Sequence, residues 1–471
     1  MSELPGGPGR PFGGNPGRPF GDEYDNLRAA TGIDAHVRQR VQKQVTELTQ
    51  RRTDDRRRRN LVGAVQSRWA DTRHVPIDLV TTTEGPDSLV LRGEILLRQT
   101  SWDDSRVRAY VEGRGLERVA VGCEALEGRL VRLVAPESMT SRQLDDIVAE
   151  LRDRGHAASL THVTPLQPVV KPCSSVAATA IEAFPDYPVS SGDSDGVKVA
   201  IVDTGIDART RTDGWLAGIP RTSDDTTTPE DDSNVDPLDV DPLDGLLDFS
   251  AGHGTFVSGI VAQVAPGADI TVYRALTTAG TGSEIDVACA LIHAVRDGAQ
   301  IVNLSLGTQT LSNQPALALA VALEVIAEHE RDTSTETLIV AAAGNFGDTV
   351  PTWPAAFRRV VSVGSLTSDL RPSTFSSRGW WIDCSTVGEG ILSTYVEGAQ
   401  SPAFTDDPET FGPNAFARWT GTSFAAPQVT GAIARIAQAQ GISARQAYIA
   451  LLATGRPLPD FGQTFSILPG V

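Results

Sequence analysis

The sequence has little that would mark a membrane, secreted or nucleic-acid-binding protein. No apolar segment is long enough to span a bilayer, and the first residues, MSELPGGPGRPFGG, lack the apolar core of a secretory signal. Lysine and arginine together number 41 against 59 acidic residues, and a net charge of −18 disfavours general binding to nucleic acid. We therefore expect a cytoplasmic protein with no membrane partner and no nucleic-acid partner.

Cysteine is also scarce. The chain has four, Cys123, Cys173, Cys289 and Cys384, and their spacing shows none of the close pairs typical of metal sites. In a chain without a secretory signal, such residues are expected to be reduced thiols. The sequence therefore predicts no disulfide, no structural zinc and no metal ligand.

Apolar residues and glycine are plentiful: 40% of the 471 residues are hydrophobic and 44 are glycine, enough for several globular domains. Residues 1–25 contain PGRPFG twice among glycine and proline, which predicts a flexible tail and leaves a recognition peptide as the alternative. Residues 26–84 are predicted to be helical, because Val41, Val45 and Leu48 recur at helical spacing.

Residues 85–167 have the pattern of a small α+β domain. SLVLRGEILLR and AASLTHVT are typical of strands, and TSRQLDDIVAELRDRG has apolar residues at helical spacing before a glycine stop. The complete order, β-α-β-β-α-β, predicts a ferredoxin-like domain. Three prolines in PLQPVVKPCSS then predict a linker, which we place at residues 168–195.

From residue 196 the pattern changes to alternating strands and helices. VKVAIVDTG, DITVYRAL, AQIVNLSLG, TLIVAAAGN and VVSVGSL are continuous apolar runs, and alanine-rich stretches lie between several of them. Such alternation predicts an α/β domain with a mostly parallel sheet and helices on both faces. We place this domain at residues 196–460 and expect residues 461–471 to be a C-terminal tail.

Four polar residues lie at the ends of predicted strands or near the starts of predicted helices. Asp203 ends the strand VKVAIVD, His253 lies between two glycines at a predicted helix start, Asn345 follows another strand, and Ser423 precedes an apolar helix. Each has an ordinary structural interpretation, as a cap, a buried imidazole or a turn residue. Ligand sites of parallel sheets form at the carboxyl ends of the strands, so the four together favour a catalytic site.

These residues lie in motifs that resemble the signature blocks of subtilisin-like serine proteases. VAIVDTGID, GHGTFVSGIVA, NLSLG, AAGN and GTSFAAPQVTGA agree with that family in content and order over about residues 196–455. The resemblance implies a serine endopeptidase with a subtilisin-like fold, acting on peptide or protein substrates and requiring no cofactor.

The resemblance also implies a role for each candidate residue. Ser423 would be the nucleophile and His253 the base that accepts its proton, while Asp203 would orient and stabilise the imidazole. The Ser423 backbone N–H and the Asn345 amide would bind the oxyanion of the tetrahedral intermediate.

Two short segments resemble the backbone edges that flank an extended substrate in this family. The residues concerned are Gly280, Thr281, Gly282, Ser305, Leu306 and Gly307. Glu284, with Asp286 nearby, follows the first edge, where the carboxylates favour a basic substrate residue unless both are ordinary surface acids. Thr352 would lie at the wall of the primary pocket, which implies small or medium apolar substrate residues.

The sequence departs from the simple family pattern in two places. An acidic insertion at residues 223–248 lengthens the connection between Asp203 and His253. Three roles are open for it: a structural calcium site, a solvated lid, or an attractor for basic peptides. The domain at 85–167 resembles the family's prodomain, which implies an intramolecular inhibitor, although a partner-docking module is the alternative. The activity itself has two alternatives: a regulatory scaffold with a closed protease domain, and acyl transfer or peptide cyclisation through the same acyl-enzyme.

Overall fold

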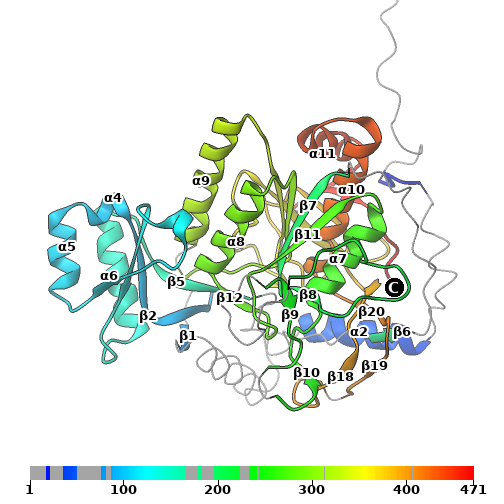
Figure 1. Ribbon diagram of the computed structural model, residues 1–471, viewed down its shortest axis with the longest axis horizontal. Coiled ribbons are helices and arrows are strands. Elements are labelled where there is room, and N and C mark those ends of the chain that lie inside the picture. The colour runs from blue at the N-terminus through cyan, green and yellow to red at the C-terminus, as the bar shows by residue number, and fades with distance from the viewer. Residues whose placement is uncertain are drawn as a thin grey trace, which may run out of the picture.

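Two units lie side by side in the computed structural model (Figure 1). The structure describes residues 17–21, 35–49, 76–80, 86–165, 179–181, 196–222, 233–240, 243–311, 313–405 and 407–471. We call residues 76–80 and 86–165 the N-terminal unit, and the described residues between 196 and 471 the C-terminal unit.

The N-terminal unit is built on an antiparallel sheet with the strand order β5-β2-β4-β3, to which β1 adds by pairing with β2. Its elements are β1 (Ile77–Val80), β2 (Ser88–Arg98), α4 (Gln99–Trp102), α5 (Ser105–Glu112), β3 (Glu117–Val119), η1 (Glu124–Leu126), β4 (Leu130–Val134), α6 (Ser141–Asp153) and β5 (Ala158–Pro165). The order from β2 to β5 is β-α-β-β-α-β, as the sequence predicts for a ferredoxin-like domain.

The two faces of this sheet pack against different partners. Ile95 and Leu97 of β2 face α5 and α6, where they share a core with residues such as Leu144. Leu96 points to the opposite face, because successive side chains of a strand alternate, and it packs with residues of the C-terminal unit such as Leu291. The N-terminal unit therefore completes the burial of its sheet only against its neighbour.

The C-terminal unit is built on an eight-stranded sheet with the order β11-β7-β13-β14-β15-β16-β22-β21. All neighbouring strands run parallel except the last pair, β22 and β21. The strands are β7 (Lys198–Asp203), β11 (Asp269–Arg274), β13 (Ile301–Leu304), β14 (Leu338–Ala342), β15 (Val360–Leu366), β16 (Cys384–Val387), β21 (Arg456–Leu458) and β22 (Gly462–Phe465). The buried apolar runs of the sequence form its centre.

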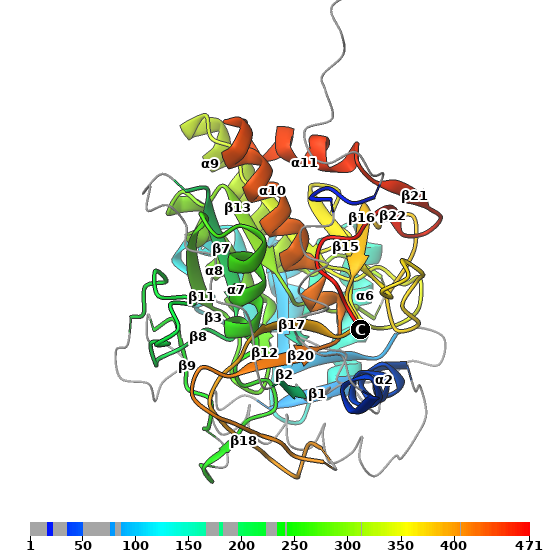
Figure 2. The ribbon, with the colours of Figure 1, turned by 90° about the vertical axis from the view of Figure 1, so that its right-hand side faces the viewer.

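Helices cover both faces of this sheet. On one face lie α7 (His253–Val264) and α10 (Ala426–Gln440), which Figure 2 shows in front of the strands, followed in the chain by α11 (Ala444–Leu452). On the other face lie α8 (Glu284–Arg296) and α9 (Leu317–Thr333), between the sheet and the N-terminal unit (Figure 1). This arrangement confirms the predicted fold class.

Shorter elements complete the described part of the chain. They are α2 (Ala35–Thr49), β6 (Thr179–Ile181), β8 (Ile206–Asp207), β9 (Val235–Asp236), β10 (Leu246–Leu247), β12 (Thr281–Ser283), β17 (Ile391–Thr394), β18 (Gly398–Gln400), β19 (Thr410–Phe411), β20 (Phe416–Trp419) and η2 (Thr422–Phe424). Strand β6 pairs antiparallel with β20, so the predicted linker 168–195 contains one strand among its described residues.

The prediction of a C-terminal tail at residues 461–471 is wrong. Strand β22 pairs with β16 inside the main sheet, and Phe465, Ile467 and Leu468 are buried. The apolar residues of FSIL pack into the core of the C-terminal unit. The composition of this short segment does not show that such a core is available to it.

The flexible-tail prediction for residues 1–25 is also wrong where the structure describes that segment. The backbone of Gly17 donates to Thr454 O and accepts from Ser466 N, and Phe20 is buried with the guanidinium of Arg435 over its ring. Residues 17–21, which belong to the second PGRPFG copy, are therefore docked on the C-terminal unit.

The helical prediction for residues 26–84 holds over α2 and fails at β1. Helix α2 packs on the C-terminal unit through Val41, Leu48 and a hydrogen bond from Gln44 Nε2 to Arg418 O (Figure 2). Other residues of this range lie outside the described parts of the chain.

The expectation of reduced thiols is wrong for one pair. Cys123, just before η1, and Cys289, on α8, form a disulfide although they are 166 residues apart in the sequence. Docking of the N-terminal unit on α8 brings their Cα atoms to 5.9 Å. Cys384 is a buried free thiol, and Cys173 lies outside the described residues.

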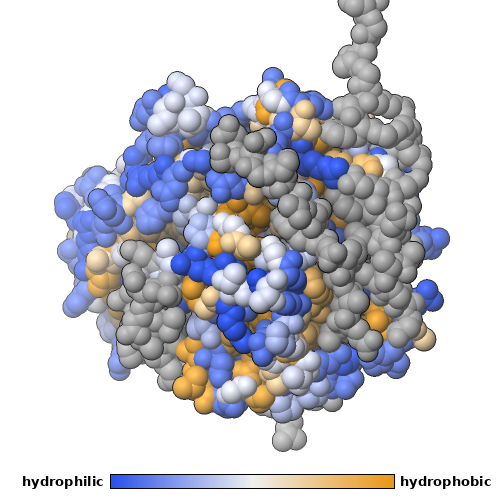
Figure 3. Space-filling view, turned by 45° about the vertical axis from the view of Figure 1, so that its right-hand side comes forward, coloured by the Kyte–Doolittle hydropathy of each residue, from blue (hydrophilic) through white to orange (hydrophobic). Residues whose placement is uncertain are grey.

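Within the described residues, none of the helices has both the length and the apolar character needed to cross a bilayer. The face shown in Figure 3 carries hydrophilic residues interspersed with apolar ones.

Candidate active site

Asp203 and His253 meet at the carboxyl edge of the large sheet. Asp203 is the last residue of β7 and His253 the first of α7, and both are fully buried. The Nδ1 atom of His253 lies 2.8 Å from Asp203 Oδ1, which also accepts a hydrogen bond from the Thr204 N–H at 2.7 Å. The carboxylate is therefore fixed in place, and it holds the imidazole with Nε2 turned away from it.

His253 Nε2 has no hydrogen-bond partner among the described residues, although the atom is buried. Its ring packs against Trp419, at 5.4 Å between ring centroids, and Phe424, at 5.3 Å, and these two rings also contact each other. These aromatic side chains exclude water from the buried imidazole. Nε2 is therefore available to accept a proton from a nearby hydroxyl.

The glycines beside His253 are needed for close backbone packing. Gly252 has a φ of +78° and a Cβ there would lie 2.7 Å from Val396 Cγ2. A Cβ on Gly254 would lie 2.1 Å from Gly205 O, so only glycine lets α7 approach the turn after β7.

Ser423 lies in η2, one turn before α10, and its side chain does not cap that helix. Its Oγ donates to Ser305 O at 3.0 Å, and its carbonyl accepts from Ser305 Oγ at 2.8 Å. No hydrogen bond joins Ser423 to His253 in the described part of the chain. Phe424, the next residue, contacts the His253 ring, so a change of the Ser423 rotamer is the motion needed to bring Oγ toward Nε2.

Asn345 follows β14 and is 1% exposed. Its Oδ1 accepts from both the backbone N–H and the hydroxyl of Thr422, each at 2.9 Å. This fixes the plane of the amide, with Nδ2 only 3.3 Å from where a Cβ on Gly421 would lie. A side-chain amide donor is thus held beside the residues that lead into Ser423.

The first predicted substrate edge is occupied by the N-terminal unit. Strand β12 pairs antiparallel with the end of β5, with Gly282 opposite Thr164 and Thr281 opposite Pro165. Thr164 Oγ1 also donates to Gly282 O at 3.1 Å. Gly280 lies outside β12, in the turn before it.

The second predicted edge reaches the same strand from the other side. The Gly307 N–H donates to Pro165 O at 3.2 Å, whereas Ser305 is bonded to Ser423 and Leu306 is buried. The end of strand β5, at Pro165, therefore lies between β12 and Gly307, where an extended substrate peptide was expected.

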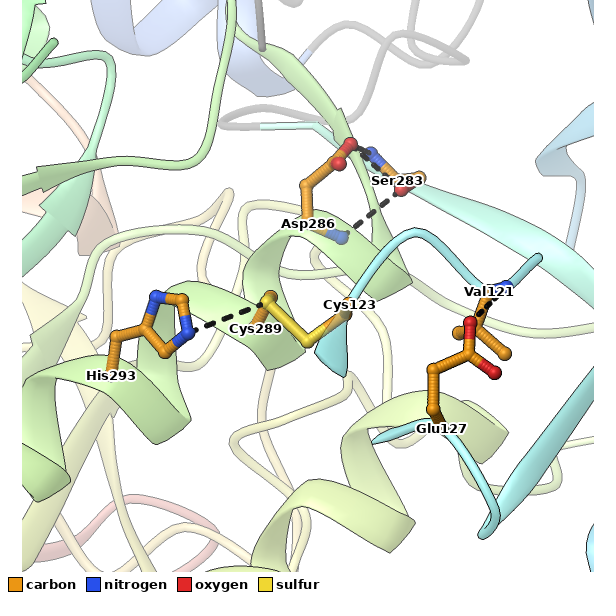
Figure 4. Close-up of a disulfide and its surroundings, with 7 residues drawn as sticks. All are labelled: Val121, Cys123, Glu127, Ser283, Asp286, Cys289 and His293. Atoms are coloured by element: carbon orange, nitrogen blue, oxygen red, sulfur yellow. Dashed lines mark hydrogen bonds between the residues drawn. A yellow bond between two sulfur atoms is a disulfide. The ribbon is translucent and has the colours of Figure 1, made fainter. Parts of the chain in front are cut away.

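Glu284 and Asp286 are not free surface acids. Glu284 is fully buried: its Oε1 accepts from His162 N at 2.8 Å and lies 3.1 Å from His162 Nδ1, and its Oε2 accepts from Ala318 N at 2.7 Å. Asp286 forms a capping box with Ser283 at the start of α8 (Figure 4). Glu284 therefore contacts the occupying strand through His162.

Thr352 lies behind the second edge, next to Gly307. Its methyl group would lie 2.7 Å from a Cβ on Gly307, and its hydroxyl 3.1 Å from one on Gly344. Thr352 is fully buried, and its Oγ1 has no partner among the described residues.

In its described part, the acidic insertion is held by hydrogen bonds and does not form a solvated lid. Asp239 accepts from Gly245 N, Asp248 accepts from Val240 N, and Asp236 is buried beside the active site. These aspartates bond backbone N–H groups of their own loop. Within the described residues, no three acidic, histidine or cysteine side chains are grouped to hold a metal ion.

Asp236 is the residue that sequence reasoning missed. Burial raises its pKa to about 6, partly offset by hydrogen bonds from Gly252 N and the Thr204 hydroxyl. It is one of many aspartates in its segment, so no sequence signal separates it from the others.

Comparison with known proteins assigns the chain. A model of the subtilase family of peptidases matches residues 194–456, more than half of the chain. The chain belongs to the subtilase family. This is a family of serine-type endopeptidases, and Asp203, His253, Asn345 and Ser423 all lie in the matched region.

Curated relatives agree with this assignment. The subtilase is 32% identical over 270 residues to the thermophilic serine proteinase of Bacillus sp. (strain AK1), covering 54% of this chain and 55% of that protein. It is 30% identical over 281 residues to thermitase of Thermoactinomyces vulgaris, covering 57% of this chain and 84% of thermitase. The chain thus spans about half the length of the Bacillus enzyme.

Among solved structures, fervidolysin from Fervidobacterium pennivorans, a keratinolytic enzyme related to subtilisin, covers 83% of this chain. The TM-score is 0.53, the sequence identity is 21%, and the match covers 61% of fervidolysin. This likeness shows the fold alone.

Proposed function

We propose that this subtilase is a serine endopeptidase whose nucleophile is Ser423. The observation that carries the proposal is the buried Asp203–His253 hydrogen bond, next to Ser423 and with His253 Nε2 unpaired among the described residues. His253 accepts the Ser423 proton as Oγ attacks the scissile carbonyl, and the Asp203 carboxylate stabilises the imidazolium that forms. His253 then returns the proton to the leaving amine.

The developing oxyanion is bound by hydrogen-bond donors that are held in place before the reaction. Asn345 is anchored through Thr422, so its Nδ2 loses little freedom when it donates to the oxyanion. The Ser423 backbone N–H supplies the second donor. This chemistry needs no metal and no organic cofactor.

A fluorophosphonate probe tests the chemistry without knowledge of the substrate. We expect the probe to label wild-type protein at Ser423 and to leave the Ser423→Ala variant unlabelled. The Ser393→Ala variant is the control, since that buried serine donates to Phe256 O and not to a triad residue. Failure of folded wild-type protein to label would remove the endopeptidase proposal.

We further propose that the N-terminal unit inhibits this active site in cis. Two observations support it: β5 pairs with β12, and Gly307 donates to Pro165 O. An extended peptide binds by adding a strand between such edges, so substrate and β5 compete for the same backbone groups. A tethered competitor acts at an effective concentration of about 1 mM, so modest affinity keeps the site filled.

The inhibition is tested by comparing full-length protein with protein that is nicked between residues 166 and 195, reduced at Cys123–Cys289 and then separated from the N-terminal unit. On an unstructured peptide pool, we expect the separated form to be many times more active. Adding the N-terminal unit back in trans should suppress that activity again. Equal activity in the intact and separated forms would make the N-terminal unit a docking module.

For specificity, we propose that Glu284 favours a basic or hydrogen-bond-donating substrate residue. The support is the occupying strand, in which His162 places its backbone N–H and its imidazole on the Glu284 carboxylate. Once the strand leaves, Oε1 faces the incoming peptide, whereas Oε2 stays bonded to Ala318 N. A Glu284→Gln variant should lose this preference when cleaved termini are sequenced, while the preference near Thr352 for small residues stays.

A further inference from the structure

A buried carboxylate that the proposed reaction does not use lies behind the catalytic pair. Asp236 in β9 is 1% exposed. Its Oδ2 accepts from Thr204 Oγ1 and from the Gly252 N–H, each at 2.9 Å, and its Oδ1 accepts from the Leu238 N–H at 3.2 Å. Burying a carboxylate is costly unless it is hydrogen-bonded in this way.

The partners of Asp236 are the chain neighbours of the catalytic pair. Thr204 follows Asp203 and donates its N–H to the Asp203 carboxylate, and its hydroxyl accepts from Gly254 N at 3.1 Å. Gly252 directly precedes His253. One carboxylate group thus joins the segment that carries Asp203 to the segment that carries His253.

We propose that Asp236 is a positioning residue that sets the separation of Asp203 and His253. Replacement by asparagine substitutes an NH₂ group for an acceptor oxygen and leaves either the Gly252 or the Leu238 N–H facing a donor. The turn after β7 and the start of α7 then lose their common anchor, and the Asp203–His253 hydrogen bond loosens.

The inference rests on the proposed endopeptidase activity, and its test includes a measurement that needs no activity. We expect Asp236→Asn to lower kcat on the order of 10²-fold, the scale of a misplacement near 1 Å, with KM little changed. The NMR signal of the His253 Nδ1 proton should move away from its wild-type position. Asp248→Asn, another buried aspartate of the same segment that bonds Val240 N, should leave both unchanged.

A Thr204→Val variant removes the hydroxyl that donates to Asp236 and accepts from Gly254 N, and it keeps the Thr204 N–H bond to Asp203. It should show the same changes in smaller degree, and it is the test to use if Asp236→Asn does not fold. Folded variants with wild-type kcat and an unmoved Nδ1 signal would overturn the positioning role. Wild-type protein that has been nicked, reduced and separated from the N-terminal unit, and that has the Nδ1 signal but no activity, would instead overturn the proposed function.

A second inference comes from an independent feature, the disulfide between the two units (Figure 4). Cys123 belongs to the N-terminal unit and is 4% exposed, and Cys289 is on α8, five residues after Glu284. A cut in the chain after Pro165 therefore leaves the N-terminal unit covalently bound beside the groove that β5 fills.

We infer that release of the N-terminal unit needs two covalent events, a cut in the connecting chain and reduction of Cys123–Cys289. The reductant is a dithiol: it gives two electrons and two protons, the S–S bond breaks into two thiols, and the dithiol becomes a disulfide. Until then the disulfide keeps β5 at a high effective concentration, as the peptide link did before the cut. This inference rests on the proposed inhibition.

The test uses full-length protein nicked between residues 166 and 195 and assayed on an unstructured peptide pool with and without dithiothreitol. We expect the two fragments to stay together on a non-reducing gel, low activity without reductant, and a many-fold rise with it. The nicked double variant Cys123→Ser, Cys289→Ser should be active without reductant. Cys384→Ser should still need it, because that thiol is buried and unbridged.

Full activity of nicked wild-type protein without reductant would overturn the tether, as would alkylation of both cysteines in unreduced protein. Intact protein as active as the nicked and reduced form would overturn the inhibition itself, so the two failures are distinguishable.

Discussion

The two units of the molecule complete their cores in different ways. The sheet of the C-terminal unit is covered on both faces by helices of its own chain segment, such as α7 and α8. The sheet of the N-terminal unit has α5 and α6 on one face and the helices of its neighbour on the other. A sheet needs a partner on each apolar face, so the N-terminal unit is complete only when docked.

The difference extends to the chemistry. All four candidate catalytic residues come from the C-terminal unit, whereas the N-terminal unit contributes a strand, a disulfide and ion pairs. One unit thus holds the candidate reactive groups, and we propose that the other controls access to them. The predictions that follow test this division, first within the reactive unit and then at the contact.

The largest expected effect is from Ser423→Ala. We expect turnover to fall by about 10⁶-fold, the scale known when subtilisin loses its nucleophile, with little change in stability. Peptide hydrolysis by the released C-terminal unit measures it. Retention of most activity by the purified variant would mean that the reactive group lies elsewhere.

The next effect is from Asn345→Ala. Turnover should fall by about 10²–10³-fold, again the scale of the equivalent loss in subtilisin, because one donor to the oxyanion is lost. KM should change little, since the bond forms mainly in the transition state. A variant that loses substrate binding but keeps kcat would make Asn345 a substrate contact.

A smaller effect is expected from Thr164→Val, at the contact between the units. The change removes the hydrogen bond to Gly282 O and keeps the shape of the side chain, so inhibition in trans should weaken by about 2- to 12-fold. Thr161→Val on the same strand is the matched control, because the Thr161 hydroxyl is buried without a partner among the described residues. Equal inhibition constants for the two variants would show that β5 does not bind through this bond.

The smallest effect is expected from the ion pairs at the edge of the contact. Arg98 bonds Glu324 at 2.5 and 2.6 Å, and Arg129 bonds Glu328 at 2.5 and 3.1 Å. Both pairs are partly exposed, so Arg98→Ala should weaken inhibition in trans by only about 2- to 5-fold, and less at high salt. An effect that does not change with salt would argue against a charge contribution.

Much of the fold was predictable from the sequence because its signals are local. The apolar runs of β7, β13 and β14 are continuous because parallel strands are buried on both faces. Helix α6 also has local signals: the capping residue Thr140 at its start and the helical spacing of Leu144, Ile147 and Val148. The positions of Asp203 and His253 follow from the strand end and the helix start that carry them.

What the sequence did not predict depends on contacts between distant segments. Cys123 and Cys289 pair only because the N-terminal unit docks on α8, and Phe20 is buried only because the C-terminal unit accepts it. Glu284 looked like a surface acid because the strand that covers it is over a hundred residues away. Asp236 resembles its acidic neighbours until the fold places it behind Asp203.

The most direct test of the central claim, that β5 fills the substrate groove of an otherwise competent site, is the labelling rate of Ser423 by two probes. A small fluorophosphonate needs only the reactive groups, whereas a peptidyl phosphonate with a four-residue arm must also pair with β12. We predict that the peptidyl probe labels intact protein far more slowly than the separated C-terminal unit, with a much smaller difference for the small probe. Equal rates of the peptidyl probe on the two forms would contradict the account.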